Sequence, residues 1–291
     1  MSIRPTDSIL EVTSLYVRFG GIRALNDVTF SVIENGITAV IGPNGAGKTT
    51  LFNCLTGFYK PSQGDIRYSH QGRSWNIPKL LGEEYQGSDL FQPQKLFSKF
   101  YYRVFGGSHQ VASLGIARTF QNIRLFKEMT VIENLIVAQH RQINRNLLSG
   151  LMRTKSYRQS ESQAAEKAFH WLKFVGLESQ GNRLAGELPY GHQRRLEIAR
   201  AMCTDPRLVC LDEPAAGLNH RETEELSELI RKLGDLKYTV LVIEHDMSLV
   251  MGVSDQIIVL NHGEVIAQGT PKQVKHDPHV LAAYLGDEGE V

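Results

Sequence analysis

Hydrophobic and polar positions alternate with a period of two in the first part of the chain. Residues 15–19 and 28–32 both follow this spacing, which predicts half-buried strands. Residues 37–41 form an unbroken apolar run instead, as expected for a strand buried on both faces of a parallel sheet. A helical pattern follows at residues 48–55, and residues 65–68 predict a further strand. The chain therefore begins as a β-rich region interrupted by one helix.

The middle of the chain, residues 130–176, changes to the helical period. Two apolar helix faces are predicted there, formed by Val131, Leu135 and Ala138 and by Ala165, Phe169 and Leu172.

The last hundred residues alternate between strand and helix patterns. Apolar runs at residues 208–211 and 239–243 flank a charged amphipathic helix at 221–232. This alternation favours an α/β fold with a parallel sheet and helical crossovers. Residues 256–260 and 264–267 predict a terminal hairpin.

Composition and charge argue against several classes of function. The net charge of +1 argues against a dedicated nucleic-acid binder, so no nucleic-acid partner is expected. No stretch reaches the ~18 consecutive apolar residues of a membrane span, and the first seven residues lack an apolar signal core. The chain is therefore expected to stay in the cytoplasm. The three cysteines, Cys54, Cys203 and Cys210, fit no metal-site spacing and are interpreted as reduced packing residues.

Residues 42–49 read GPNGAGKT and match the phosphate-binding pattern G-x-x-x-x-G-K-[ST], between a predicted strand and a predicted helix. The glycines let backbone N–H groups converge on phosphate oxygens, and the helix N-terminus adds partial positive charge. Lys48 is expected to reach the β- and γ-phosphates, and the Thr49 hydroxyl to ligate Mg²⁺. The candidate nucleotide-binding residues of this loop are Gly42, Pro43, Asn44, Gly45, Ala46, Gly47, Lys48, Thr49 and Thr50.

Two acids, Asp212 and Glu213, end the predicted strand at 208–211. Ligands of parallel sheets bind beyond the carboxyl ends of the strands, where the phosphate loop also lies. Asp212 can hold Mg²⁺ through water there, and Glu213 is placed to orient or deprotonate an attacking water.

The order of motifs resembles the ABC transporter ATPase family over about residues 9–285. Besides the phosphate loop and the acid pair, the resemblance is carried by RTFQ at 118–121, LPYGHQRR at 188–195, AGLN at 216–219 and EHD at 244–246. It implies a P-loop NTPase (RecA-like) core with an antiparallel β subdomain. An α-helical subdomain is expected at about 122–190, an insertion at about 72–107 and a tail at 286–291.

In this family two ATPases pair head to tail, and each ATP lies between one phosphate loop and the signature segment of the partner. The resemblance thus implies a contact across the dimer by Pro189, Tyr190, Gly191 and His192. It makes Glu213 and His245 the catalytic residues, with His245 bonding the γ-phosphate. Gln121 would touch Mg²⁺ beside Thr49 and Asp212, and Phe19 would stack on adenine.

Several segments resemble the importer class for branched-chain amino acids, in particular the larger of its two ATP-binding subunits. They include TVIEN at 130–134, EHDM at 244–247 and AYLG at 283–286. The implied partners are a second ATPase, identical or homologous, and membrane permeases. A substrate-binding protein would act indirectly, and the chain would lie at the cytoplasmic face of the inner membrane. ATPases of urea importers and of a lipopolysaccharide exporter are related, so these remain alternatives. A soluble ABC-type ATPase is less compatible with one phosphate loop and no sustained heptad.

Two features depart from the family pattern. Pro189 stands where the signature usually has serine, which removes a hydroxyl and one N–H donor. The range 72–107 also contains a basic amphipathic pattern, with its apolar face formed by Leu96, Phe97, Phe100, Tyr101, Val104 and Phe105. Such a helix either packs on its own domain or rests on a membrane or partner.

Overall fold

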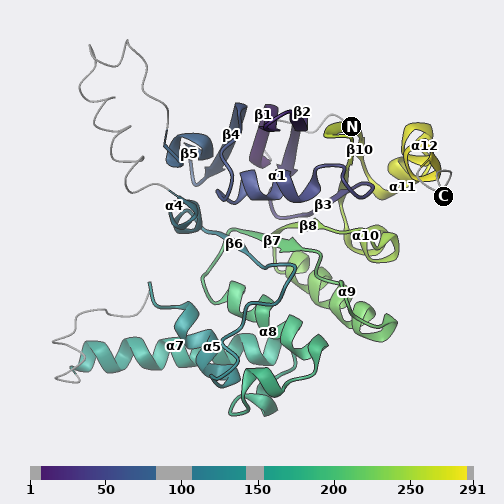
Figure 1. The fold of residues 1–291 in the computed structure, drawn as a ribbon. Helices are drawn as coiled ribbons and strands as arrows, with labels where there is room; N and C mark the ends of the chain where they lie inside the picture. The colour runs from purple at the N-terminus through teal and green to yellow at the C-terminus, as the bar shows by residue number, and fades with distance from the viewer. Residues whose placement is uncertain (1–7, 83–106, 142–153, 287–291) are drawn as a thin grey trace, which may run out of the picture.

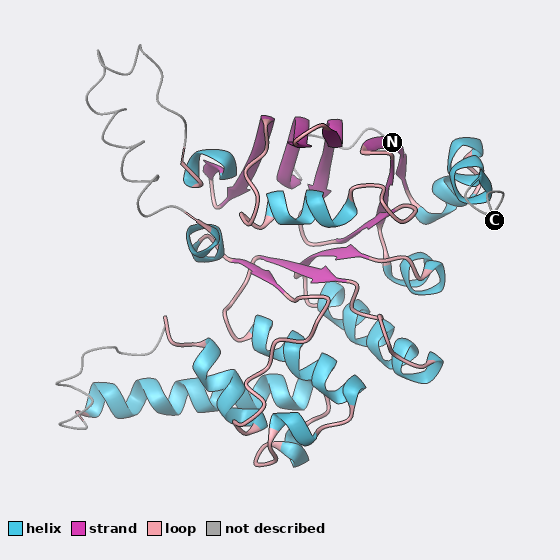
Figure 2. Cartoon of the chain, in the orientation of Figure 1, coloured by secondary structure: helices cyan, strands magenta, loops and turns pink. Residues whose placement is uncertain are grey.

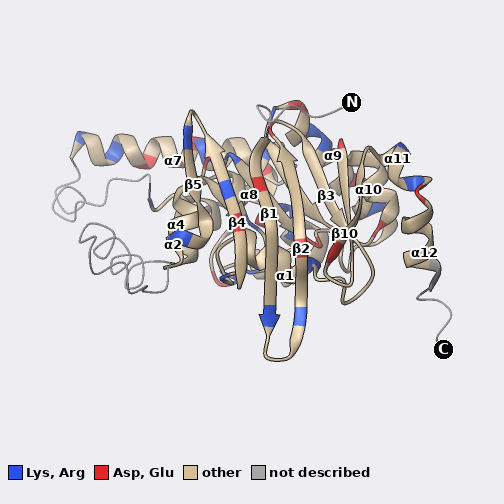
Figure 3. Cartoon of the chain, turned by 90° about the horizontal axis from the view of Figure 1, so that it is seen from above, with Lys and Arg blue, Asp and Glu red and all other residues tan. Residues whose placement is uncertain are grey.

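The computed structural model describes residues 8–82, 107–141 and 154–286, and they form two sheets with helices between and below them (Figures 1 and 2). The smaller sheet is antiparallel, in the order β2-β1-β4-β5. Its strands are β1 (Ser8–Phe19), β2 (Ile22–Ile33), β4 (Gln63–His70) and β5 (Arg73–Asn76). Figure 3 looks onto this sheet, where basic and acidic positions are interspersed along the strands.

The larger sheet has six strands in the order β10-β9-β3-β8-β7-β6. All neighbours are parallel except the terminal hairpin of β9 and β10. The strands are β3 (Ile37–Ile41), β6 (Ile116–Arg118), β7 (Leu208–Asp212), β8 (Thr239–Ile243), β9 (Gln256–Asn261) and β10 (Glu264–Gly269). Every residue of β3, β7 and β8 is buried, as the apolar runs predict for strands covered on both faces.

One hydrophobic cluster fills the space between the two sheets. Helix α1 (Lys48–Leu55) lies there and contributes Leu51, Phe52 and Leu55 (Figure 1). The short helices α2 (Ile77–Leu80) and α4 (Ser108–Ser113) lie at the β5 end of this layer. The phosphate-loop helix is therefore fixed between two sheets.

A second cluster covers the opposite face of the larger sheet. Its helices are α5 (Val131–Ala138), α7 (Lys155–Phe174), α8 (Tyr190–Met202) and α9 (His220–Asp235), with 3₁₀ turns at Glu178–Gln180 and Ala185–Glu187. The third cluster packs α10 (Met247–Val253), α11 (Pro271–Lys275) and α12 (Pro278–Gly286) against the β9–β10 end. None of the described helices is long and apolar enough to cross a membrane.

Several sequence expectations can be compared with these elements. The helix at 48–55 and the terminal hairpin are confirmed, and the three cysteines are free and buried. Burial raises the pKa of each thiol to about 12, so they stay protonated packing groups. The predicted apolar face of α7 is wrong at Phe169, which is exposed, whereas Leu172 is buried as predicted. The buried face is rotated by about one residue and consists of Ala164, Ala168, Trp171 and Leu172.

The boundaries of the expected insertion, about 72–107, remain a prediction, and its first described residues form β5 and α2. β5 pairs with β4, and α2 buries Ile77 and Leu80. The amphipathic pattern at 96–105 lies outside the described residues. The boundaries of the helical subdomain, about 122–190, remain a prediction.

Candidate nucleotide-binding site

The loop at residues 42–47 joins β3 to α1, and its backbone requires glycine at two points. At Gly42, with φ of 151°, an added Cβ would lie 2.0 Å from the Leu260 carbonyl oxygen. At Gly47, which caps α1 with φ of 99°, it would lie 2.7 Å from the Ala24 carbonyl oxygen. These close approaches hold the loop against β2 and β9 and leave its N–H groups at the start of α1.

The Lys48 side chain is curled beneath this loop and nearly buried. Its Nζ donates to the carbonyl oxygens of Gly42, at 2.6 Å, and Pro43, at 2.8 Å. Burial lowers the pKa of Lys48, whereas the nearby Glu213 carboxylate raises it. The amine is therefore held at the loop within the electrostatic range of Glu213. Thr49, Asn44 and Gly45 are exposed around it.

Glu213 follows β7 in a left-handed conformation, with φ of 43°, which is uncommon for a residue with a side chain. Its N–H donates to the Ile243 carbonyl oxygen at 2.9 Å. Its Oε2 accepts from the Gln121 side-chain amide at 2.7 Å. Two residues 92 positions apart in the sequence are thus brought together at the carboxyl end of the sheet.

Asp212 is paired with Arg118, a contact that the sequence reasoning missed. The Arg118 Nη2 lies 2.8 Å from Asp212 Oδ2, and Nη1 donates to Asn53 and Thr56. The guanidinium also lies about 5 Å from the ring centroids of three aromatic residues, Phe52, Phe58 and Phe120. Burial raises the pKa of Asp212, and the hydrogen bond from Arg118 opposes that rise. Arg118 is the first residue of the RTFQ motif, but its place in the sequence does not indicate Asp212 as its partner.

The predicted magnesium ligands Thr49, Gln121 and Asp212 supply hydroxyl, amide and carboxylate oxygens, the donor type that Mg²⁺ prefers. Among the described residues, no cluster of three or more His, Cys, Asp or Glu side chains could hold a metal by itself. This donor set fits a magnesium ion that keeps several waters and is shared with substrate phosphates.

His245 is an exposed residue just beyond β8. Its neighbour Glu244 is fully buried and accepts from the N–H groups of Ala215 at 2.7 Å and His245 at 3.0 Å. Burial raises the pKa of Glu244, and these backbone hydrogen bonds lower it. Glu244 therefore fixes the backbone that carries His245 and the segment after Glu213. The sequence indicates Glu244 only by its place in the EHD motif at 244–246.

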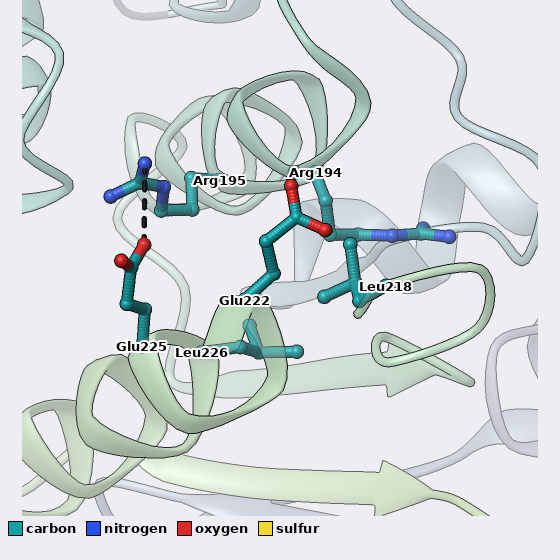
Figure 4. Close-up of a pocket in the computed structure, with 7 residues that line it drawn as sticks. Arg194, Arg195, Leu218, Glu222, Glu225 and Leu226 are labelled. Carbon is teal, nitrogen blue, oxygen red and sulfur yellow. Dashed lines mark ion pairs between the residues drawn. The ribbon is translucent and has the colours of Figure 1, made fainter. Parts of the chain in front are cut away.

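The signature segment forms the start of α8, with Pro189 at the N-cap. The N–H groups of the first turn have no intrahelical acceptor, as at any helix start. Figure 4 shows this turn packed on α9, with Arg195 reaching Glu225 and Arg194 pointing away from Glu222. A Cβ on Gly191 would lie 2.5 Å from Glu222 Oε1, so a larger residue there would displace the Glu222 side chain. Burial is the main cause that lowers the pKa of His192.

Phe19 lies at the end of β1, before the Gly20–Gly21 turn, and is about half exposed. Its ring contacts Tyr59 edge to face, with centroids 5.4 Å apart. The ring is accessible, and its stacking on adenine remains a prediction.

Pro189→Ser is expected to leave the ATPase rate of the assembled transporter equal or higher, because serine restores a cap hydroxyl and an N–H at a helix start. Steady-state phosphate release from wild-type and variant complexes measures the effect. A clear fall in rate would show that the proline has a role of its own.

This chain resembles known proteins over nearly its whole length. The sequence model of the ABC transporter family matches residues 25–216, and that of the branched-chain amino acid ATP-binding cassette transporter matches 264–290. BraF of Pseudomonas aeruginosa, a high-affinity branched-chain amino acid transport ATP-binding protein, is 52% identical over 280 residues. These cover 96% of this chain and 98% of BraF. LivG of Escherichia coli K12, which has the same description, is 48% identical with the same coverage.

Solved structures are similar over nearly the whole chain. A nucleotide-free ATP-binding cassette from an ABC transporter has a TM-score of 0.70 at 31% identity, covering 95% of this chain and 98% of that one. The ADP conformation of an ABC transporter cassette has a TM-score of 0.71, also at 31% identity, covering 96% and 99%. The expected α/β P-loop NTPase fold is thereby confirmed, and the chain belongs to the ABC transporter family as one of its ATP-binding subunits.

Proposed function

We propose that this protein is the ATP-hydrolysing subunit of an ABC importer that carries branched-chain amino acids across the cytoplasmic membrane. The observation that carries the ATPase role is the convergence of Lys48, Gln121 and Glu213 at one end of the sheet. The similarity of residues 264–290 to the branched-chain amino acid cassette supports the substrate class. The protein would act at the cytoplasmic face, held there by permease subunits.

In the proposed reaction the loop N–H groups and Lys48 bind the β- and γ-phosphates of ATP. Mg²⁺, when bound, neutralises charge on these phosphates. Glu213 orients a water in line with the γ-phosphorus and accepts its proton. The new P–O bond forms as the bond to ADP breaks, which yields ADP and phosphate. His245 donates a hydrogen bond to the γ-phosphate, and Gln121 joins the site to the loop that carries it.

A second ATPase subunit, identical or homologous, would complete the site. The first turn of α8, at Tyr190, Gly191 and His192, points N–H groups outward from a helix start. In a head-to-tail pair these groups meet the γ-phosphate bound by the partner. ATP then favours the closed pair by binding it better than the open form.

A groove of ≈ 840 Å³ between the β subdomain and the helical layer suits a permease segment. Exposed apolar side chains line it, among them Phe58, Phe126 and Val137. Among the described residues, its charged lining includes Arg141, Arg200, Arg207 and one acid, Asp205. Glu197 and Arg118 also line it, but they are neutralised by Arg194 and Asp212. An apolar segment with acidic residues therefore fits it best. Phe120, beside Gln121, lies in the same groove, so a docked segment would touch the loop that reaches Glu213.

Val137→Glu is expected to reduce association with the permease subunits by at least about tenfold, because a charge is added in the apolar part of the groove. Leu236→Glu is a matched control: both residues lie at the end of a helix and are exposed, by 38% and 54%, but Leu236 is outside the groove. Co-purification of tagged permease measures the effect. Equal recovery with both variants would contradict docking at this groove.

The transported class is tested with the complete complex in proteoliposomes. ATP-dependent accumulation of labelled leucine is expected, together with its competition by isoleucine and valine. ATPase activity stimulated by urea or by lipopolysaccharide, and not by these amino acids, would contradict the proposed substrate.

A further inference from the structure

A fully buried ion pair lies in the first turns of α8. Arg194 is 0% exposed and Glu197 1% exposed, and Nη1 of Arg194 lies 2.9 Å from Oε2 of Glu197. Arginine and glutamate are rarely buried so completely, because desolvation of both charges opposes folding. The rest of their hydrogen-bonding capacity therefore has to be satisfied inside the protein.

Apart from Nε of Arg194, which is buried without a hydrogen-bond partner among the described residues, that capacity is directed mainly at the backbone of the loop at residues 120–124. Arg194 donates from Nη1 to the Phe120 carbonyl oxygen at 2.8 Å and from Nη2 to the Gln121 carbonyl oxygen at 2.7 Å. Oε1 of Glu197 accepts from the N–H of Phe120 at 3.4 Å and of Arg124 at 3.2 Å. The pair thus holds this loop by two carbonyl oxygens and two N–H groups.

The loop and the Arg194–Glu197 pair each contact a residue of the proposed functional site. On the loop side, the Gln121 side chain donates to Glu213. On the helix side, Nη2 of Arg194 also donates to the Tyr190 hydroxyl at 3.2 Å. The Tyr190 ring packs on Gly217, where an added Cβ would lie 3.2 Å from it. A continuous set of contacts therefore runs from Glu213 to the signature segment of the same chain.

We propose that the Arg194–Glu197 pair is a positioning device that transmits nucleotide occupancy at this chain's own site to its signature segment, residues 189–192. The inference rests on the nucleotide site proposed above. A γ-phosphate that draws in Gln121 moves the loop backbone. Because Arg194 and Glu197 hold that backbone by four hydrogen bonds, the first turn of α8 moves with it. Occupancy of one site then changes the surface offered to the partner's site.

The neighbouring pair Arg195–Glu225 provides a control. It lies on the same turn of α8, joins that helix to α9 at 3.7 Å and is partly exposed (Figure 4). Neither residue has a hydrogen bond to the 120–124 loop among the described contacts. Its removal alters α8 packing without touching the proposed connection.

Hydrogen–deuterium exchange of the full chain, with and without a non-hydrolysable ATP analogue and Mg²⁺, tests the proposal. In the wild type, nucleotide is expected to slow exchange at residues 42–49 and to change it at 188–195. The double variant R194M/E197M removes both charges at similar volume. It is expected to keep the nucleotide-induced change in exchange at 42–49. The corresponding change at 188–195 is expected to fall by at least about fivefold, which is the lower end of ordinary coupling strengths. R195M/E225M is expected to keep both responses.

The proposal is overturned if R194M/E197M retains the wild-type response at 188–195, or if the control variant loses it equally. A wild type protected at 42–49 with no response at 188–195 also overturns it. Lack of protection at 42–49 in the wild type would instead contradict the proposed nucleotide site. If R194M/E197M fails to fold, judged by exchange in β1 and β2 without nucleotide, R194K replaces it. A lysine cannot hold two carbonyl oxygens and Glu197 at once, so a reduced response at 188–195 is expected. An unchanged response would contradict the proposal.

Discussion

Glu213→Gln is expected to lower ATP turnover of the assembled transporter by about 10²- to 10⁴-fold, the usual contribution of a positioned general base. The variant amide is nearly isosteric, and its oxygen can still accept from Gln121, which lies 2.7 Å from the native carboxylate. The fold and the left-handed backbone at residue 213 therefore persist. Only the proton acceptor for the attacking water is lost.

Two measurements separate this effect from a loss of binding. Phosphate release gives turnover, and a fluorescent ATP analogue gives affinity, which is expected to stay within about threefold because no phosphate ligand is removed. Glu228→Gln, an exposed acid on α9, is the matched control and should change neither quantity. Turnover of Glu213→Gln within tenfold of wild type would exclude the base role.

Lys48→Ala is expected to weaken nucleotide binding by about 10- to 100-fold, since charge-assisted hydrogen bonds contribute about 1.5–3 kcal/mol each. The structure adds a second reason. Lys48 donates to the carbonyl oxygens of Gly42, in a buried contact, and of Pro43, in a partly buried one, so its removal also loosens the loop around the phosphates. The loss should grow with the number of phosphates on the ligand, because the amine is aimed at the terminal ones.

Titration with AMP, ADP and ATP analogues measures this dependence. Lys232→Ala, on the exposed side of α9, serves as the control and should bind all three as the wild type does. Equal affinity of Lys48→Ala and wild type for the ATP analogue would remove Lys48 from the site. A loss that is the same for AMP and ATP would point to general loosening of the loop.

The sequence predicts those parts of the fold that are set by local pattern. The strand at 37–41 and the helix at 48–55 coincide with β3 and α1, because a fully apolar run and a glycine-rich helix start are local signals. The terminal hairpin was found for the same reason. Phe169 shows the limit of periodicity, because the buried face of α7 includes Ala164, Ala168 and Trp171 instead, and the Trp171 ring contacts Phe174 and Tyr238.

The sequence predicts only those residues of the candidate site that belong to recognisable motifs. Phosphate loop, acids and histidine each carry a recognisable pattern, and the fold brings Gln121 to Glu213 as expected of one site. The supporting charges are invisible in the sequence. Arg194 and Glu197 read as solvated residues of a polar helix, and only contact with a loop 74 residues away shows that they are buried. The contacts of Arg118 likewise depend on three segments that are distant in the sequence, at residues 52–58, 118–120 and 212.

The second hydrophobic cluster sets how the signature segment can move. Leu196, Ile198 and Met202 of α8 share it with Val209 of β7 and with residues of β3 and β8. A close-packed interior resists sliding, since displaced side chains would leave voids. Helix α8 can therefore rock about its sheet-facing side but not travel along it. The buried residues of α7 begin only at Ala164, and its N-terminal half extends away from the sheet (Figure 1). This half of α7 is therefore expected to be displaced furthest when α8 rocks.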